Sequence, residues 1–273
     1  MGTRTEITPA RLAAPRQRHE LKGADVGETS DRQQAIEALR YLPKDVPGVR
    51  AVIDSLRAIA ERHAQRPREN ELACLSYLCR EITREVRERV GNNELVDTGF
   101  VTRLDVEFAT RYFDAVFADE AGTPLPNSWR VLLARRPALD VDTLQFARVG
   151  GNAHISHDLA FALLSMCRAL GRPFGEAEYA DYEAINQMFA DHMSQLREHV
   201  ESRLHRALGA GVFALVASAV GELTVVFARD AAWHRGERIA TLLDPSPELD
   251  RARLAIDWQA AMVGRAVLDL PAQ

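Results

Sequence analysis

The stretch Gly150-Gly151-Asn152-Ala153-His154-Ile155-Ser156-His157-Asp158-Leu159 leads into the apolar segment Ala160–Leu170, and together they predict the central helix of the fold. At the helical period of about 100° per residue, His154 and Asp158 lie one above the other on the same face. The pair borders an apolar stripe formed by Ile155, Leu159, Ala162, Leu163 and Met166. An imidazole one turn away from a carboxylate suits either acid–base chemistry or the binding of a metal ion.

The same helical period recurs along most of the chain, and no segment shows the sustained alternation of a half-buried strand. We therefore expect an all-α protein with a single multi-helix, bundle-like domain over residues 31–273. Residues 1–30 are polar and contain no Phe, Trp or Tyr, which predicts a disordered N-terminal extension.

Three polar residues are candidates for helix N-caps. Ser128 is expected to cap a short helix, and Ser246 is expected to cap the last helix, with Pro247 at its first position. Asn152 follows two glycines, so it could cap a helix that restarts there, but the central helix could equally run through the glycines without a break.

Composition limits the class of protein. Lys and Arg total 34 against 39 Asp and Glu, for a net charge of −5, which argues against a nucleic-acid partner. The three cysteines are odd in number, and no secretory signal precedes them, so we expect a reduced, cytoplasmic protein. The longest uncharged run, Ala207–Gly221, is shorter than the about 20 residues that a membrane-spanning helix needs.

Four of the predicted helices place polar residues on or beside their apolar stripes. An unpaired buried polar group costs roughly 1–3 kcal/mol, so residues in such positions need a partner or a function. The candidates for catalysis, and for binding a divalent metal ion if there is one, are His154, Asp158 and Asp105. The candidates for binding a small-molecule substrate are Asn152, Asn186, Arg229, Tyr112 and Tyr182.

Structural roles are the alternative for each of these residues. Asp105 and Arg229 could form a buried ion pair between two helices. A single inward histidine is often a core residue with satisfied hydrogen bonds, although a carboxylate four residues after His154 favours a functional role. The histidines expected on the surface are His157, His192, His199, His205 and His234. The tryptophans expected in the core are Trp129, Trp233 and Trp258.

Several blocks of this sequence resemble the bacterial family catalogued as domain of unknown function 5995. The blocks are Leu104–Tyr112, Gly151–Ile155 followed by Asp158-Leu159, Asp181-Tyr182 with Asn186, and Ala228-Arg229 with Ala232-Trp233. The resemblance extends from about Val49 to Pro271 and implies an all-helical cytoplasmic domain with these polar residues in common. It implies no particular activity. Gly151 stands where a bulkier residue such as methionine would be expected, which predicts a slightly larger pocket beside Asn152.

Three functions remain open at this point. The first is a small-molecule enzyme, of lyase, cyclase or hydrolase type, with a pocket around His154 and Asp158 and with or without a metal ion. The second is a non-catalytic protein that binds an apolar small molecule inside the bundle. The third is a structural or partner-binding module whose buried polar network fixes the register of the helices.

Overall fold

The computed structural model of the chain describes residues 46–64, 70–134, 143–187 and 222–269. Within these ranges the regular structure is entirely helical and contains no strand, which confirms the predicted all-α fold. The expected N-terminal extension, the start of the domain at residue 31, and His192, His199 and His205 lie outside the described residues.

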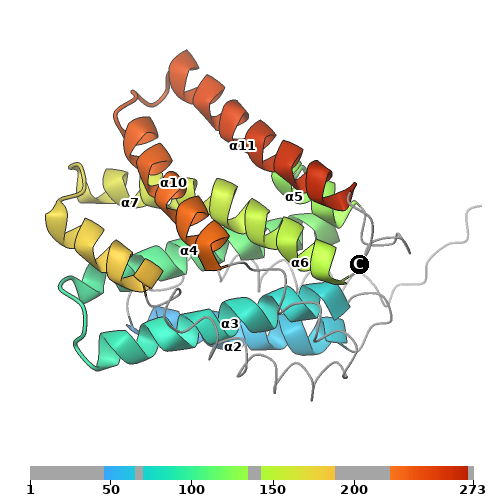
Figure 1. Cartoon of the computed structure of the whole chain (residues 1–273), viewed down its shortest axis with the longest axis horizontal. Helices are drawn as coiled ribbons and strands as arrows, with labels where there is room; N and C mark the ends of the chain where they lie inside the picture. Colours follow the sequence, from blue (N-terminus) through green and yellow to red (C-terminus); the bar gives the residue numbers. More distant parts are fainter. Residues whose placement is uncertain (1–45, 65–69, 135–142, 188–221, 270–273) are drawn as a thin grey trace, which may run out of the picture.

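The helices form three layers, which Figure 1 shows from the side. The first layer pairs α2 (Val46–Ala64) with α3 (Asn70–Gly91). The middle layer contains α4 (Thr98–Ala121) beside a long rod of three successive elements: α6 (Thr143–Asn152), η1 (Ala153–Leu159) and α7 (Ala160–Leu170).

The third layer consists of α10 (Glu222–Ala240) and α11 (Pro247–Leu268), which cross the rod at different places. Helix α10 packs against η1 and α7, whereas α11 packs against α6, η1 and the short helix α5 (Asn127–Leu133). Residues 176–187 form a further helix, and Tyr182 in it packs against Trp233 of α10. Element η1 therefore lies at the centre of the fold, between α4 on one side and both helices of the third layer on the other.

The central rod is continuous and does not restart at the glycines. Asn152 has helical dihedral angles (φ −63°, ψ −46°) and makes no side-chain capping hydrogen bond, so of the two alternatives the continuous helix is correct and the N-cap is not. Gly150 is needed for close packing, because a Cβ atom there would lie 2.6 Å from Cδ2 of Leu75 on α3. From Ala153 to Leu159 the rod winds as a π-helix.

The predicted caps have different outcomes. Ser246 accepts a hydrogen bond from the backbone N–H of Leu249 and is followed by Pro247, as expected. Ser128 does not cap α5, because that helix begins one residue earlier, at Asn127, and Ser128 lies in its first turn. The cap of α5 comes instead from a distant residue, Asp257 of α11, as described below.

The three tryptophans also differ. Trp129 and Trp233 are fully buried, as predicted, but Trp258 is 50% exposed and is not a core anchor. The buried face of α11 is formed by small residues, Ala260, Ala261 and Gly264, which pack closely on the neighbouring helices. Trp258 lies on another face of α11, which leaves half of its surface exposed. None of the described helices combines the length and the apolar character needed to cross a membrane.

Candidate functional site

The π-helical element η1 buries three ionisable side chains within five residues. His154, His157 and Asp158 are exposed by 6, 9 and 2%, respectively. The prediction that His157 lies on the surface is therefore wrong. A regular helical wheel places His157 opposite the apolar stripe, but in the structure η1 is packed on both sides, and Asp257 of α11 lies 4.0 Å from Nε2 of His157.

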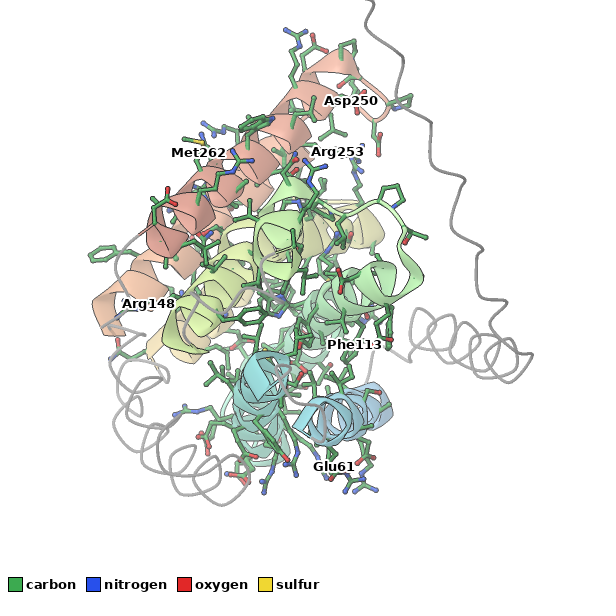
Figure 2. The ribbon with its side chains drawn as sticks, turned by 90° about the vertical axis from the view of Figure 1, so that its right-hand side faces the viewer. Glu61, Phe113, Arg148, Asp250, Arg253 and Met262 are labelled. Carbon is green, nitrogen blue, oxygen red and sulfur yellow. The ribbon has the colours of Figure 1, made fainter. Side chains whose placement is uncertain are left out.

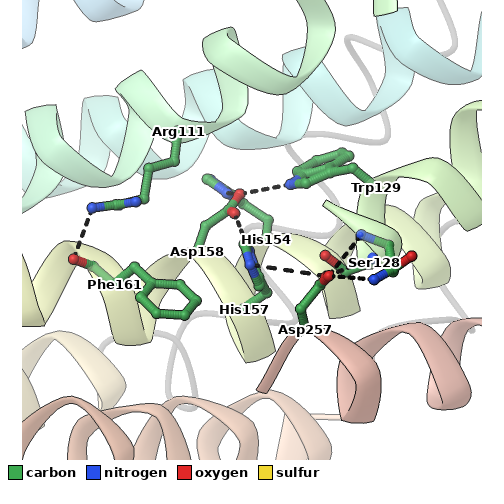
Figure 3. A network of polar contacts seen from close by, with 9 residues as sticks. Arg111, Ser128, Trp129, His154, His157, Asp158, Phe161 and Asp257 are labelled. Carbon is green, nitrogen blue, oxygen red and sulfur yellow. Dashed lines mark hydrogen bonds and ion pairs between the residues drawn. The ribbon is translucent and has the colours of Figure 1, made fainter. Parts of the chain in front are cut away.

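Asp158 is the centre of this group (Figure 3). Its Oδ2 lies 3.0 Å from Nδ1 of His154 and accepts a hydrogen bond from the indole N–H of Trp129 at 2.9 Å. Its Oδ1 lies 2.7 Å from Nδ1 of His157. Burial alone would raise the pKa of Asp158, but the hydrogen bonds and charges of the two histidines outweigh burial and lower that pKa to about 2.

The ionised state of Asp158 determines the protonation of both histidines. A carboxylate can only accept hydrogen bonds, so His154 and His157 must each carry a proton on Nδ1. In a neutral imidazole the other nitrogen, Nε2, then holds a lone pair. Asp158 thus sets the tautomer of His154 in which Nε2 is the basic atom.

Aromatic side chains hold the ring of His154 in place. It stacks on Phe108 with ring centroids 3.6 Å apart and planes 4° from parallel. Tyr112 and Trp129 lie at an angle to it, with centroids at 5.7 and 6.2 Å. Among the residues that the structure describes, none forms a hydrogen bond with Nε2 of His154.

Asp257 extends the network to α11 and α5. Its Oδ1 lies 4.0 Å from Nε2 of His157 and accepts a hydrogen bond from the backbone N–H of Ser128 at 2.8 Å. Its Oδ2 accepts from the backbone N–H and the side-chain amide of Asn127, at 2.8 and 2.7 Å. Burial opposes ionisation of Asp257, but these hydrogen bonds outweigh it and lower its pKa.

Sequence reasoning missed Asp257, although a signal for it existed. Asp257 follows Ile256 and precedes Ala260 and Ala261 by one turn, so the helical wheel places it on the buried face of α11.

Arg111 is a second residue that sequence reasoning missed. It donates hydrogen bonds to the Phe161 carbonyl and the Ser165 hydroxyl, both at 2.8 Å, and burial lowers its pKa although the nearby charge of Asp158 acts in the opposite direction.

Asp105 lies on α4, one turn before Phe108, and has a different environment from Asp158. Its Oδ1 accepts a long hydrogen bond of 3.4 Å from the Thr83 hydroxyl. Its Oδ2 is inaccessible to solvent and has no hydrogen-bond partner among the described residues. Burial therefore raises the pKa of Asp105 to about 7, despite the opposing effects of Thr83 and of the charge on Arg229.

Arg229 joins the remaining predicted residues into a second polar group. Its Nε donates a hydrogen bond of 2.6 Å to Oδ1 of Asn186, and its guanidinium lies 5.2 Å from the centre of the Tyr182 ring. The Tyr182 hydroxyl donates to the backbone carbonyl of Arg229 at 2.6 Å. The charges of Asp105 and Arg229 influence each other, as expected of neighbouring groups of opposite sign.

Asn152 and Tyr112 connect helices. The Asn152 amide donates to the carbonyl of Ala260 on α11 at 2.7 Å and accepts from the Ser156 hydroxyl at 3.1 Å. The Tyr112 hydroxyl lies 2.7 Å from the Ser76 hydroxyl on α3. A Cβ atom added at Gly151, beside Asn152, would meet no atom within 4 Å, so a bulkier residue would fit at this position.

The expected metal ligands do not form a cluster. In the described ranges, no three His, Cys, Asp or Glu side chains are placed so that they could hold a metal ion. Six of the eight sequence-predicted residues instead form two groups, one of His154 and Asp158 and one of Asp105, Asn186, Tyr182 and Arg229. Asn152 and Tyr112 form their hydrogen bonds outside both groups. Helix α4 links the two groups, because it carries both Asp105 and the Phe108 ring that stacks on His154.

The sequence profile of a family described as "Family of unknown function (DUF5995)" matches residues 49–270. The chain belongs to this family. The network of Trp129, His154, Asp158 and Asp257 lies wholly within the part of the chain that matches DUF5995. Neither the search of curated proteins nor the search of solved structures found a match to this chain. An account of function therefore has to start from the geometry of the site.

Proposed function

We propose that this DUF5995 protein is a small-molecule enzyme of the lyase, cyclase or hydrolase type, in which His154 is the general acid–base. The observation that carries the proposal is the buried pair of Asp158 Oδ2 and His154 Nδ1, 3.0 Å apart. An ionised carboxylate in this position fixes the tautomer of the imidazole and stabilises the imidazolium that forms when Nε2 takes a proton.

Two further features support this role for His154. The pair lies on a π-helical turn, and such turns occur frequently at functional sites. The ring is stacked on Phe108 and held between other aromatic side chains, which restrains its orientation as catalysis requires.

We also propose that the protein is cytoplasmic. Cys167 has a thiol that donates a hydrogen bond to the Arg172 carbonyl, and cysteines remain as thiols in the reducing cytoplasm.

The second polar group supplies the substrate side of the proposed site. Asp105 has a pKa near 7, so it can donate or accept a proton at neutral pH. We assign substrate binding to the remaining polar residues that the sequence singled out: Asn152, Asn186, Arg229, Tyr112 and Tyr182. The proposed proton transfer itself uses residues of the chain and needs no metal ion.

The main competing function is a structural one. Asp158 contacts three side chains from two segments, and His154 packs against three aromatic rings. The same contacts would fix the register of α4, α5 and the central rod without any reaction taking place. Under this alternative, changes at His154 lower stability and affect nothing else.

Turnover can be tested without knowing the substrate. Purified protein is incubated with a bacterial metabolite extract, and untargeted mass spectrometry records which compounds are consumed. We expect the wild type to consume at least one compound, His154→Gln to do so at least about 100-fold more slowly, and the control His234→Gln to match the wild type. His234 suits as a control because it is an exposed histidine on α10. No consumption by the wild type, or equal rates for wild type and His154→Gln, would contradict the proposal.

A further inference from the structure

Helix α11 is apolar on both of its faces. Its inner face buries Ile256, Ala260 and Ala261. Its outer face exposes Leu254, Trp258 and Met262, each by half or more of its surface. Figure 2 shows Met262 on the side of α11 that points away from the rest of the bundle.

No charged residue originates on the outer face over three turns, although the guanidinium of Arg265 reaches it from the end, 5.3 Å from the centre of the Trp258 ring. Between Arg253 and Arg265 the only ionisable residue is Asp257, which faces inward and caps α5. A helix at the surface of a monomer usually has charged residues on its outer face, and a helix that is apolar all round is usually buried all round. The outer face of α11 therefore has the composition of an interface.

We propose that the outer face of α11 binds the same face of a second copy of this chain, with the two helices antiparallel about a two-fold axis beside Trp258. The face is self-complementary about this residue, as a two-fold interface must be. Leu254 and Met262 lie four residues before and after Trp258. In the dimer, Leu254 packs against Met262 of the partner subunit, and the two Trp258 rings meet at the centre.

The charges at the ends of the face match this arrangement. Asp250 lies about 12 Å before Trp258 along the helix, and Arg265 lies about 10 Å after it, at 1.5 Å per residue. Antiparallel pairing therefore places Asp250 beside Arg265 of the partner subunit, twice by symmetry. Both acidic residues near this end already have a partner in their own helix: Glu248 is 2.9 Å from Arg251, and Asp250 is 3.5 Å from Arg253. The Asp250 side chain is nevertheless 67% exposed, so it can also meet Arg265 of the partner subunit. Arg265 extends over its own Trp258 ring, 5.3 Å from the centre, towards the proposed axis.

Light scattering coupled to size-exclusion chromatography tests whether the pair forms. The full chain should elute with twice its mass of 30.4 kDa, and Met262→Glu should elute as a monomer with an unchanged far-ultraviolet circular dichroism spectrum. The matched control is Val96→Glu, because Val96 is an exposed apolar residue outside α11. It should remain a dimer. A wild-type chain that elutes as a monomer overturns the proposal. This holds whether the outer face of α11 is then bare or is covered by another part of the chain or by another protein. A Met262→Glu variant that remains a dimer also overturns it.

A charge exchange tests the antiparallel register. Asp250→Arg should raise the dimer dissociation constant at least about tenfold, because it faces Arg265 of the partner subunit with a like charge. Combining Asp250→Arg with Arg265→Asp should restore most of the lost affinity. If the double variant is as weak as or weaker than Asp250→Arg alone, the two residues do not meet and the proposed register is wrong.

Discussion

Trp129 donates its indole N–H to Oδ2 of Asp158 at 2.9 Å, and this is the same oxygen that contacts His154. The bond joins α5 to the π-helical turn across the core, with both side chains buried. It adds a third donor to a carboxylate whose other partners are two histidines, so Asp158 stays ionised where water cannot reach it.

The first prediction concerns the acid sensitivity of the fold. The pKa of Asp158 is lowered from 3.8 to about 2 in the folded protein. A lowered folded-state pKa contributes stability that is present above the unfolded pKa and lost as the pH falls through the folded pKa. This contribution is about 2 kcal/mol. Urea denaturation should show the wild type more stable than Asp158→Asn at pH 6, with the difference shrinking between about pH 5 and pH 2. A difference that does not change with pH would contradict the assignment.

The second prediction concerns the tautomer of His154. Since Asp158 can only accept, Nδ1 of His154 carries the proton and Nε2 is unprotonated in the neutral ring. Nitrogen-15 NMR of histidine-labelled protein should place Nδ1 of His154 at the shift of a protonated nitrogen and Nε2 at that of an unprotonated one. In Asp158→Asn this preference should weaken, because a neutral amide can also donate. A proton on Nε2 in the wild type would rule out the proposed base.

Much of the fold follows from the sequence because helices are local. The 3.6-residue period predicts the all-helical fold, Ser246 predicts the start of α11, and the contact of His154 with Asp158 follows from their spacing of four residues. The profile match over residues 49–270 likewise confirms a resemblance based on short blocks. These features depend only on residues close together in the chain.

What the sequence did not predict comes from contacts between distant parts of the chain. A helical wheel places His157 opposite the apolar stripe and so predicts exposure, whereas helices pack on both sides of η1 and bury His157 as well as Asp158. The Trp129 indole and Asp257 meet the site from α5 and α11, and no local pattern pairs residues so far apart. The exposure of Trp258 was missed for a related reason, since side-chain size alone does not show which face of α11 packs inward.

The third prediction has the opposite sign of pH dependence. Burial raises the pKa of Asp105 from 3.8 to about 7 in the folded protein. A raised folded-state pKa contributes stability that is present below the unfolded pKa and lost as the pH rises through the folded pKa. Asp105→Asn should therefore gain stability relative to the wild type between about pH 4 and pH 7, with no further change above pH 8. Denaturation curves that show a constant difference, or a change in the other direction, would indicate that Asp105 stays ionised.

The fourth prediction concerns the cap of α5. Asp257→Ala removes the acceptor of three hydrogen bonds at the start of that helix and leaves buried N–H groups without partners. The expected loss in the free energy of unfolding is about 2 kcal/mol or more. Asp54→Ala, at an exposed aspartate of α2, is the control and should cost no more than about 0.5 kcal/mol. Equal effects of the two substitutions on urea denaturation would show that the cap is not needed.

The central claim, that His154 and Asp158 act as one catalytic unit, is tested most directly by a double-mutant cycle on turnover. The wild type, His154→Gln, Asp158→Asn and the double variant are compared for their rates of consuming the compound that the metabolite screen identifies. Residues that act as a unit lose most of the activity at the first substitution. We predict that each single variant is slowed at least about 100-fold and that the double variant is hardly slower than either. Full turnover by Asp158→Asn, which keeps the size of the side chain and removes only its charge, would contradict the account.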